Sequence, residues 1–238
     1  MKTEQAVLLE NICLKYPGSD RNIVEGVSIE IPVGAITMIL GKNGSGKTTL
    51  LKAILGFLKP DFGNIQYIPK LIKNSIAFLP QIEEPYIDLS VFDFVMLGRI
   101  NFNGFFEKPK ENDILAVKYA IQRMDLKNII NKPVTAISGG EFQKVRIARA
   151  LVQGAAILLM DEPTTFLDYR AKTDFFITLN KIKESGLTII LSSHEPLDAK
   201  KYANYVILIQ ENNVVIAGET KRIMTRSNLR QTFGIDVT

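Results

Sequence analysis

The hydrophobic positions of this chain fall into short apolar runs separated by segments with helical spacing. Three of the runs, at residues 35–40, 155–160 and 187–192, are apolar at almost every position. Such runs are typical of strands that are buried on both faces of a parallel sheet. The segments between them, beginning with 47–57, have the spacing of helices. This alternation predicts an α/β core made of crossover units around a mostly parallel sheet.

The start, middle and end of the chain depart from this alternation. Residues 6–34 predict a pair of strands, and further short strands are expected at 64–68 and 75–80. Strand signals then disappear until residue 137, and helical patterns stand at 91–97 and 112–124. Near the end, residues 205–210 and 214–217 predict an antiparallel addition to the sheet, followed by a polar helix.

We therefore expect one domain, 1–238, with an N-terminal antiparallel β subdomain and an inserted helical subdomain. The predicted core comprises residues 1–80 and 155–238, and the predicted helical insertion comprises residues 81–154.

A glycine-rich segment follows the first buried run, and its sequence is that of a phosphate-binding loop. Residues 41–49 read GKNGSGKTT and lead directly into the first predicted helix. Glycines allow backbone N–H groups to approach a polyanion, and the helix directs the positive end of its dipole to the same place. Lys47 is expected to meet the β and γ phosphates, and the Thr48 hydroxyl to ligate Mg²⁺. The alternative is a glycine turn with a solvated lysine.

Two adjacent carboxylates end the second buried run. Neighbouring side chains diverge on a strand, so Asp161 and Glu162 are expected to have different tasks. Asp161 suits Mg²⁺, and Glu162 is then available to orient or deprotonate the water that attacks the γ phosphate. The alternative is an exposed strand end, where acidic residues are common.

A third candidate element stands at residues 138–141, which read SGGE and precede an amphipathic helix. Ser138 and Glu141 have the spacing of a capping box, which needs no function. The pair Gly139 and Gly140 is unexplained by capping, because glycine at a helix start has an entropic cost and permits close backbone approach. A second helix terminus that faces an anion is the functional interpretation.

Composition and charge narrow the class of protein. The chain has 46% hydrophobic and 23% charged residues, and no run approaches the roughly 18 apolar residues of a membrane span. Its polar start is unlike a secretory leader, and its single cysteine, Cys13, can form no internal disulfide, so we expect a cytoplasmic location. The net charge of +4 permits an anionic partner without requiring one.

Together these motifs resemble the nucleotide-binding subunit of an ABC transporter. Residues 41–48 match the family's Walker A loop, 138–141 its signature motif and 157–162 its Walker B strand, in the family's order and over nearly the whole chain. The resemblance implies a P-loop NTPase fold, ATP and Mg²⁺ as ligands, and ATP hydrolysis.

Four further residues acquire roles through the resemblance. Tyr16 matches the aromatic residue that stacks on adenine, although it can equally be a half-buried strand residue. Gln81 matches the Q-loop residue that senses Mg²⁺ and the attacking water. Asp168 matches the D-loop aspartate, with a helix N-cap as its alternative. His194, the only histidine, matches the switch histidine that contacts the γ phosphate, although a lone histidine is usually structural.

The complete candidate site follows from these matches. The catalytic residues are expected to be Lys47, Gln81, Glu162 and His194. The metal is expected to be held by Thr48, Gln81 and Asp161. The nucleotide is expected to contact Tyr16, Gly41, Lys42, Asn43, Gly44, Ser45, Gly46, Lys47, Thr48, Thr49, Ser138, Gly139, Gly140, Glu141 and Asp168.

The resemblance also implies partners. The family forms head-to-tail dimers in which the signature of one subunit covers ATP on the other, and the dimer drives integral membrane permease subunits. We therefore expect a homodimer on the cytoplasmic face of the cell membrane, bound through its permease and served indirectly by an extracytoplasmic binding protein. No nucleic-acid partner is expected. Phe102, Phe105 and Phe106 either line the permease groove or pack the helical subdomain.

The direction of transport is suggested by a narrower resemblance. Glu141, in place of the commoner glutamine, and the segment 91–99 are similar to importers of iron chelates, cobalamin and molybdate. Import of a metal chelate, cobalamin or an oxyanion is therefore expected. The alternatives are an exporter subunit, a soluble ABC ATPase without a transport role, and an ATP sensor that does not hydrolyse.

Overall fold

The structure is a computed structural model that describes residues 4–15, 18, 22–67, 76–81, 83, 88–100 and 108–234. The predictions for Tyr16, Phe102, Phe105 and Phe106 lie outside the described residues.

The core is a six-stranded sheet in the order β5-β6-β7-β3-β8-β9. All neighbouring strands are parallel except β8 and β9, which pair antiparallel. The strands are β3 (Ile36–Leu40), β5 (Ile76–Leu79), β6 (Ile157–Met160), β7 (Thr188–Ser193), β8 (Tyr205–Ile209) and β9 (Val215–Glu219).

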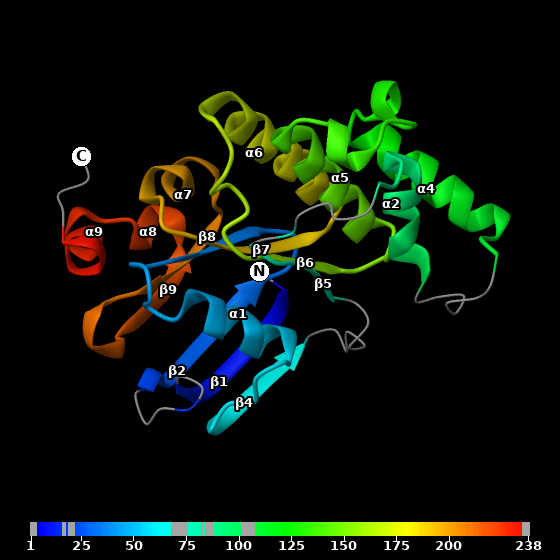
Figure 1. The fold of residues 1–238 in the computed structure, drawn as a ribbon. Coiled ribbons are helices and arrows are strands. Elements are labelled where there is room, and N and C mark those ends of the chain that lie inside the picture. Colours follow the sequence, from blue (N-terminus) through cyan, green and yellow to red (C-terminus); the bar gives the residue numbers. More distant parts are fainter. Residues whose placement is uncertain are drawn as a thin grey trace.

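The apolar runs form central strands because both of their faces are buried in separate hydrophobic clusters. On β6, Leu158 and Met160 pack in the cluster that includes the long helices, whereas Ile157 and Leu159 pack in the cluster on the opposite face. Figure 1 shows the resulting layers, with α5 (Gly139–Leu151) and α6 (Tyr169–Lys183) on one side of the sheet and α1 (Lys47–Leu55) on the other. Both faces of these strands therefore take mainly apolar residues.

A second sheet, in the order β2-β1-β4, is antiparallel and packs with α1 against the core. Its strands are β1 (Gln5–Lys15), β2 (Asn22–Pro32) and β4 (Phe62–Tyr67). The Tyr67 hydroxyl donates a hydrogen bond to the carbonyl of Ile54, which ties β4 to the end of α1. This sheet confirms the predicted N-terminal β subdomain.

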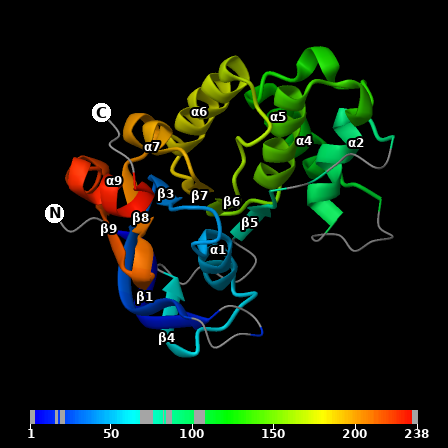
Figure 2. The same cartoon turned by 60° about the vertical axis from the view of Figure 1, so that its left-hand side comes forward.

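A group of helices stands at one end of the molecule, away from the β1-β2-β4 sheet (Figure 2). It contains α2 (Val91–Met96), α4 (Glu111–Arg123) and α5, which all contact one another, and the short 3₁₀ helices η2 (Leu97–Arg99), η3 (Lys127–Ile129) and η4 (Val134–Ala136). η2 lies so close to α5 that a Cβ atom on Gly98 would stand 2.3 Å from the carbonyl oxygen of Arg149.

The C-terminal elements complete the fold beside β8 and β9. They are α7 (Pro196–Tyr202), η5 (Glu211–Asn213), α8 (Thr220–Ile223) and α9 (Arg226–Phe233). In the part of the chain that the structure describes, no helix combines the length and apolar character needed to cross a membrane.

The predicted α/β class is confirmed, with a mixed sheet, an antiparallel N-terminal sheet and helices near the predicted positions. The division into a core and a helical insertion at residues 81–154 stays a prediction.

Candidate active site

The candidate site lies where β3, β5, β6 and β7 end on the same edge of the parallel sheet, which is where such sheets place ligands. The loop 41–46 joins β3 to α1 there, and Gly46 precedes the helix with a left-handed φ of 101°. A Cβ atom at Gly46 would come within 2.0 Å of Ile23 Cγ2. Only glycine therefore allows this loop to reach the start of α1.

Lys47 is buried at the centre of the site. Its Nζ atom donates to the carbonyl oxygens of Gly41 and Lys42 at 3.1 and 3.2 Å, and it stands 3.2 Å from Glu162 Oε1. The ammonium is thus held at the mouth of the loop by its own backbone and by the glutamate. It remains close to the N-terminus of α1, where an anion is favoured.

Thr48 and Asp161 meet although 113 positions separate them in sequence. The Thr48 hydroxyl donates to Asp161 Oδ2 at 2.8 Å, and Ser192 Oγ donates to Asp161 Oδ1 at 2.5 Å. A hydroxyl and a carboxylate are the hard oxygen ligands that Mg²⁺ accepts together with waters and phosphates. This donor pair fits a magnesium ion beside the phosphate loop.

Glu162 faces a different set of partners from Asp161, as expected for adjacent residues at a strand end. Its Oε2 atom lies 3.4 Å from both Gln81 Nε2 and His194 Nδ1. Its backbone has a left-handed φ of 41°, and its N–H donates to Ser192 Oγ at 2.8 Å. Gln81, Glu162 and His194 are therefore brought together around one carboxylate.

Two further residues of the loop 41–46, Lys42 and Ser45, differ in exposure and in their partners. Lys42 is exposed and its Nζ pairs with Glu211 Oε1 at 2.6 Å. The Oγ atom of Ser45 is buried, yet it has no hydrogen-bond partner among the described residues. Such an orphaned group fits a site that receives a polar ligand.

The start of α5 shows the predicted capping box. Ser138 Oγ accepts from the Glu141 N–H at 3.3 Å, and Glu141 Oε2 accepts from the Ser138 N–H at 2.8 Å. Hydrogen bonds from the backbone and hydroxyl of Ser138 lower the pKa of Glu141. A Cβ atom on Gly139 would meet no described atom within 4 Å, so this helix terminus is open to solvent.

Asp168 is the N-cap of α6 and accepts from the Ala171 N–H at 2.8 Å, which is the structural alternative considered for it. Together with Ser138 and Glu141 it lines a pocket of about 180 Å³. Among the described contacts, none joins this pocket to Lys47 or Thr48, so one chain does not assemble the full predicted nucleotide site.

Sequence reasoning did not identify three residues beside the site. Ser192 bonds to both Asp161 and Glu162, and its only signal was its place at the end of a buried strand. Glu83 and Arg146 line a cavity of about 360 Å³ that also includes Gln81, Phe142, Glu162 and Phe166. Neither Glu83 nor Arg146 belongs to a motif that could have indicated them.

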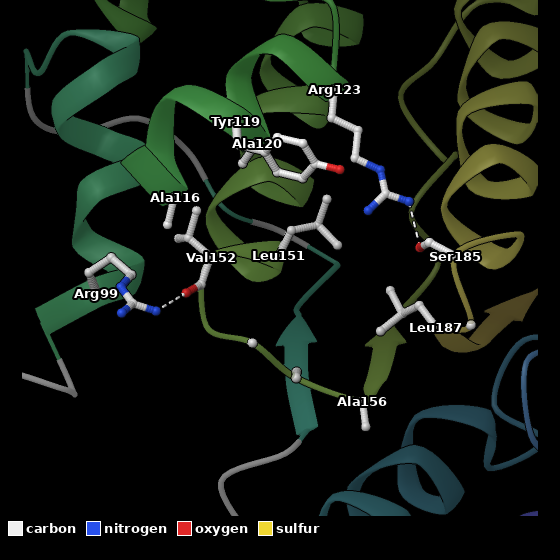
Figure 3. A pocket seen from close by; sticks show the side chains of 13 residues that line it. Arg99, Ala116, Tyr119, Ala120, Arg123, Leu151, Val152, Ala156, Ser185 and Leu187 are labelled. Carbon is white, nitrogen blue, oxygen red and sulfur yellow. Dashed lines mark hydrogen bonds between the residues drawn. The ribbon is translucent and has the colours of Figure 1, made fainter. Parts of the chain in front are cut away.

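A separate cavity of about 450 Å³ lies between α4, the end of α5 and the turn before β7 (Figure 3). Arg99 and Arg123 stand at its rim, where they donate to the Val152 carbonyl and the Ser185 hydroxyl. The cavity is lined by none of the predicted site residues.

Comparisons with known proteins show which family this chain is similar to. The model of the ABC transporter family matches residues 24–165. The chain is 35% identical to the iron(3+)-hydroxamate import ATP-binding protein of Bacillus subtilis, over 91% of this chain and 84% of that protein. It is 33% identical to a probable iron chelatin transport ATP-binding protein of Helicobacter pylori, over 93% of this chain and 90% of that protein.

The fold is similar to that of a solved structure described as a metal-chelate type ABC transporter in an inward-facing conformation. The TM-score is 0.89 at 30% sequence identity, and the match covers 98% of this chain and 90% of the other.

Proposed function

The chain belongs to the ABC transporter family, and we propose that it is the ATP-hydrolysing subunit of an importer that takes up a metal chelate through a separate membrane permease. Membership confirms the family resemblance, and with it ATP binding and the ATPase activity of the family's ATP-binding subunits. The residue roles, the metal, the dimer and the cargo are the proposed parts.

One observation carries the proposed chemistry: Lys47, Gln81 and His194 all converge on Glu162. Glu162 accepts a proton from the attacking water as the water oxygen bonds to the γ phosphorus and the bond to the ADP oxygen breaks. Gln81 orients that water, and His194 holds the carboxylate and contacts the γ phosphate. Lys47 and the N-terminus of α1 balance the charge of the phosphates.

The remaining loop residues, Gly41 to Gly46 and Thr49, are proposed to surround the phosphates through their backbone N–H groups. Thr48 and Asp161 are the proposed holders of Mg²⁺, assisted by Gln81. When bound, the ion neutralises developing phosphate charge. Ser192 keeps Asp161 turned towards Thr48 because it donates to the other carboxylate oxygen.

A second copy of the chain is proposed to complete the site. The open helix terminus at Ser138, Gly139 and Gly140 is the part that would cover ATP on the partner. Phe166 and Tyr169 lie close to Asp168 in the sequence and are 76% and 83% exposed, so both rings offer apolar area that a partner can bury. A head-to-tail dimer buries these rings and gives Asp168 a place at the interface.

The membrane partners are proposed from the relatives. The named relatives are import or transport ATP-binding proteins for iron(3+)-hydroxamate and iron chelatin. We therefore place this chain at the cytoplasmic face of the membrane, on a permease that receives its cargo from an extracytoplasmic binding protein. The proposed helical subdomain, residues 81–154, is the part that contacts the permease.

The catalytic proposal is tested by phosphate release from ATP with wild-type protein and with Glu162→Gln. The variant retains the size and one oxygen of the side chain but loses the base, so we expect kcat to fall by about 10²-fold or more with ATP affinity retained. Equal turnover by both proteins would remove Glu162 from the mechanism.

Direction and cargo are tested in cells that lack the gene for this chain. Uptake of radiolabelled ferric hydroxamate should fall and should return with the wild-type gene but not with the Glu162→Gln gene. Greater accumulation of the label in the deletion strain would instead indicate export.

A further inference from the structure

Gln81 is flanked along the chain by two groups that bind the same arginine. Arg146, in the middle of α5, donates to the carbonyl of Pro80 directly before Gln81. Its Nε atom also donates to Glu83 Oε2 at 2.9 Å, two residues after Gln81. One guanidinium therefore holds both sides of the glutamine that contacts Glu162. We call Pro80, Gln81 and Glu83 the Gln81 segment.

Glu83 is shared with a second arginine on the same helix. Arg149 Nη1 stands 2.5 Å from Glu83 Oε1, and Nη2 donates to Oε2 at 2.9 Å. Arg149 also lies over the ring of Phe94 on α2, with its Cζ atom 4.7 Å from the ring centroid. The carboxylate is thus fixed by a bidentate pair and by a third charged hydrogen bond.

The cluster is buried enough for its geometry to be well defined. The Arg146 side chain is only 6% exposed. Burial lowers the pKa of Arg146, and the Glu83 carboxylate opposes this shift. Gln143 Oε1 accepts from Arg146 Nη1 at 2.8 Å and so fixes the plane of the guanidinium. Without Glu83, two neighbouring arginines would repel each other beside the Gln81 segment.

We propose that Glu83, Arg146 and Arg149 are positioning residues that tie the Gln81 segment to α5 and thereby set the approach of Gln81 to Glu162. The N-terminus of α5 carries Ser138–Gly140, so a shift of this helix moves both ends of the candidate site together. We call these three residues the clamp. The inference rests on the proposed function, because it gives the clamp a role in ATP hydrolysis.

The test measures kcat and ATP affinity of the full chain after Glu83→Gln. The substitution keeps the size of the side chain but removes the charge that holds both arginines. Because Gln81 loses its position and the phosphate loop is untouched, kcat should fall about 10-fold to 100-fold while the Kd for ATP changes less than about twofold.

Asp113→Asn is the matched control. Asp113 is a buried carboxylate on α4 that accepts from Arg99 Nε at 2.8 Å in the same group of helices, and it is not among the described residues that line the cavity beside Gln81. This variant should have a lower Tm and a kcat near the wild-type value. A kcat in Glu83→Gln no lower than in Asp113→Asn would overturn the inference.

A double-mutant cycle separates positioning from general damage. If Glu83 acts through Gln81, then Glu83→Gln should lower kcat by less than about twofold in a Gln81→Ala background. If the kcat losses of the two single variants instead multiply in the double variant, and the wild type is active, the clamp is overturned and the proposed function is not. A wild type without ATP turnover would overturn the proposed function and the clamp with it.

Discussion

His194 contacts the same carboxylate oxygen of Glu162 as Gln81 does, at 3.4 Å, and its side chain is 41% exposed. Replacing it with alanine removes no part of the phosphate loop. His194→Ala should therefore leave ATP binding within about threefold of wild type and lower kcat by at least about tenfold. Equilibrium nucleotide binding and steady-state phosphate release measure the two quantities, and wild-type turnover would exclude His194 from the mechanism.

Glu141 gives a pH-dependent prediction at the start of α5. Because hydrogen bonds from Ser138 lower its pKa below the ordinary value of 4.5, the charged form stabilises the folded chain above that pH. This contribution is lost as the pH falls through the lowered pKa. Glu141→Gln should reduce the free energy of unfolding at pH 7 by about 0.3 kcal/mol, allowing for solvent screening.

The measurement is urea unfolding of Glu141→Gln and wild type at several pH values. The difference in unfolding free energy should shrink as the pH falls below 4.5 and should vanish once the wild-type glutamate is protonated. A difference that is constant over this range would mean that hydrogen bonding, and not charge, distinguishes the two side chains.

At the scale of elements, the packing of η2 on α5 depends on the absence of a side chain at Gly98. An added methyl group would stand 2.3 Å from the Arg149 carbonyl oxygen and 2.6 Å from Val152 Cγ2. Gly98→Ala should lower the free energy of unfolding by about 1–3 kcal/mol, because backbone must move to accept it.

Gly139→Ala is the matched control for stability, since the added methyl meets no described atom within 4 Å. Chemical denaturation should show no loss for this variant. If both alanine variants unfold at the same denaturant concentration, η2 and α5 are not tightly packed in solution.

The elements show what the sequence could and could not predict. Runs such as 155–160 were identifiable as strands because residues 157–160 pack alternately on the two faces of the sheet. The helix that carries Arg146 was also identifiable, but the arginine's partner was not, because Glu83 lies 63 residues earlier. Ser192 was missed for the same reason, since its contacts with Asp161 form only when β6 and β7 pair.

The sequence could predict the proximity of those candidate site residues that belong to recognisable motifs at strand ends. Lys47, Thr48, Asp161 and Glu162 converge as the strand ends implied. Among the described residues, the segment at 138–141 has no contact with them within one chain. Its predicted contact with ATP would need the proposed second copy, which no local pattern can place.

At the scale of the whole molecule, Phe166 offers a test of the proposed dimer. Its side chain is 76% exposed, so replacing it with serine should leave the fold unchanged. Burial of a phenylalanine contributes about 1.5–3 kcal/mol, so Phe166→Ser should weaken ATP-dependent dimerisation by about tenfold or more.

Light scattering with ATP, in a Glu162→Gln background that retains the nucleotide, measures this association. The same dimer affinity with serine at 166 would place the ring outside the contact.

The left-handed backbone of Glu162 has a consequence for the thermal tolerance of the protein. A φ of 41° suits glycine and disfavours residues with a Cβ atom by about 1 kcal/mol. Of two variants that both lack the carboxylate, Glu162→Gly should therefore melt at a higher temperature than Glu162→Ala in calorimetry. The residue proposed as the catalytic base thus adopts a backbone conformation that destabilises the fold. More thermostable variants of this chain are to be sought among those with glycine at position 162, and we expect these variants to lose ATP turnover.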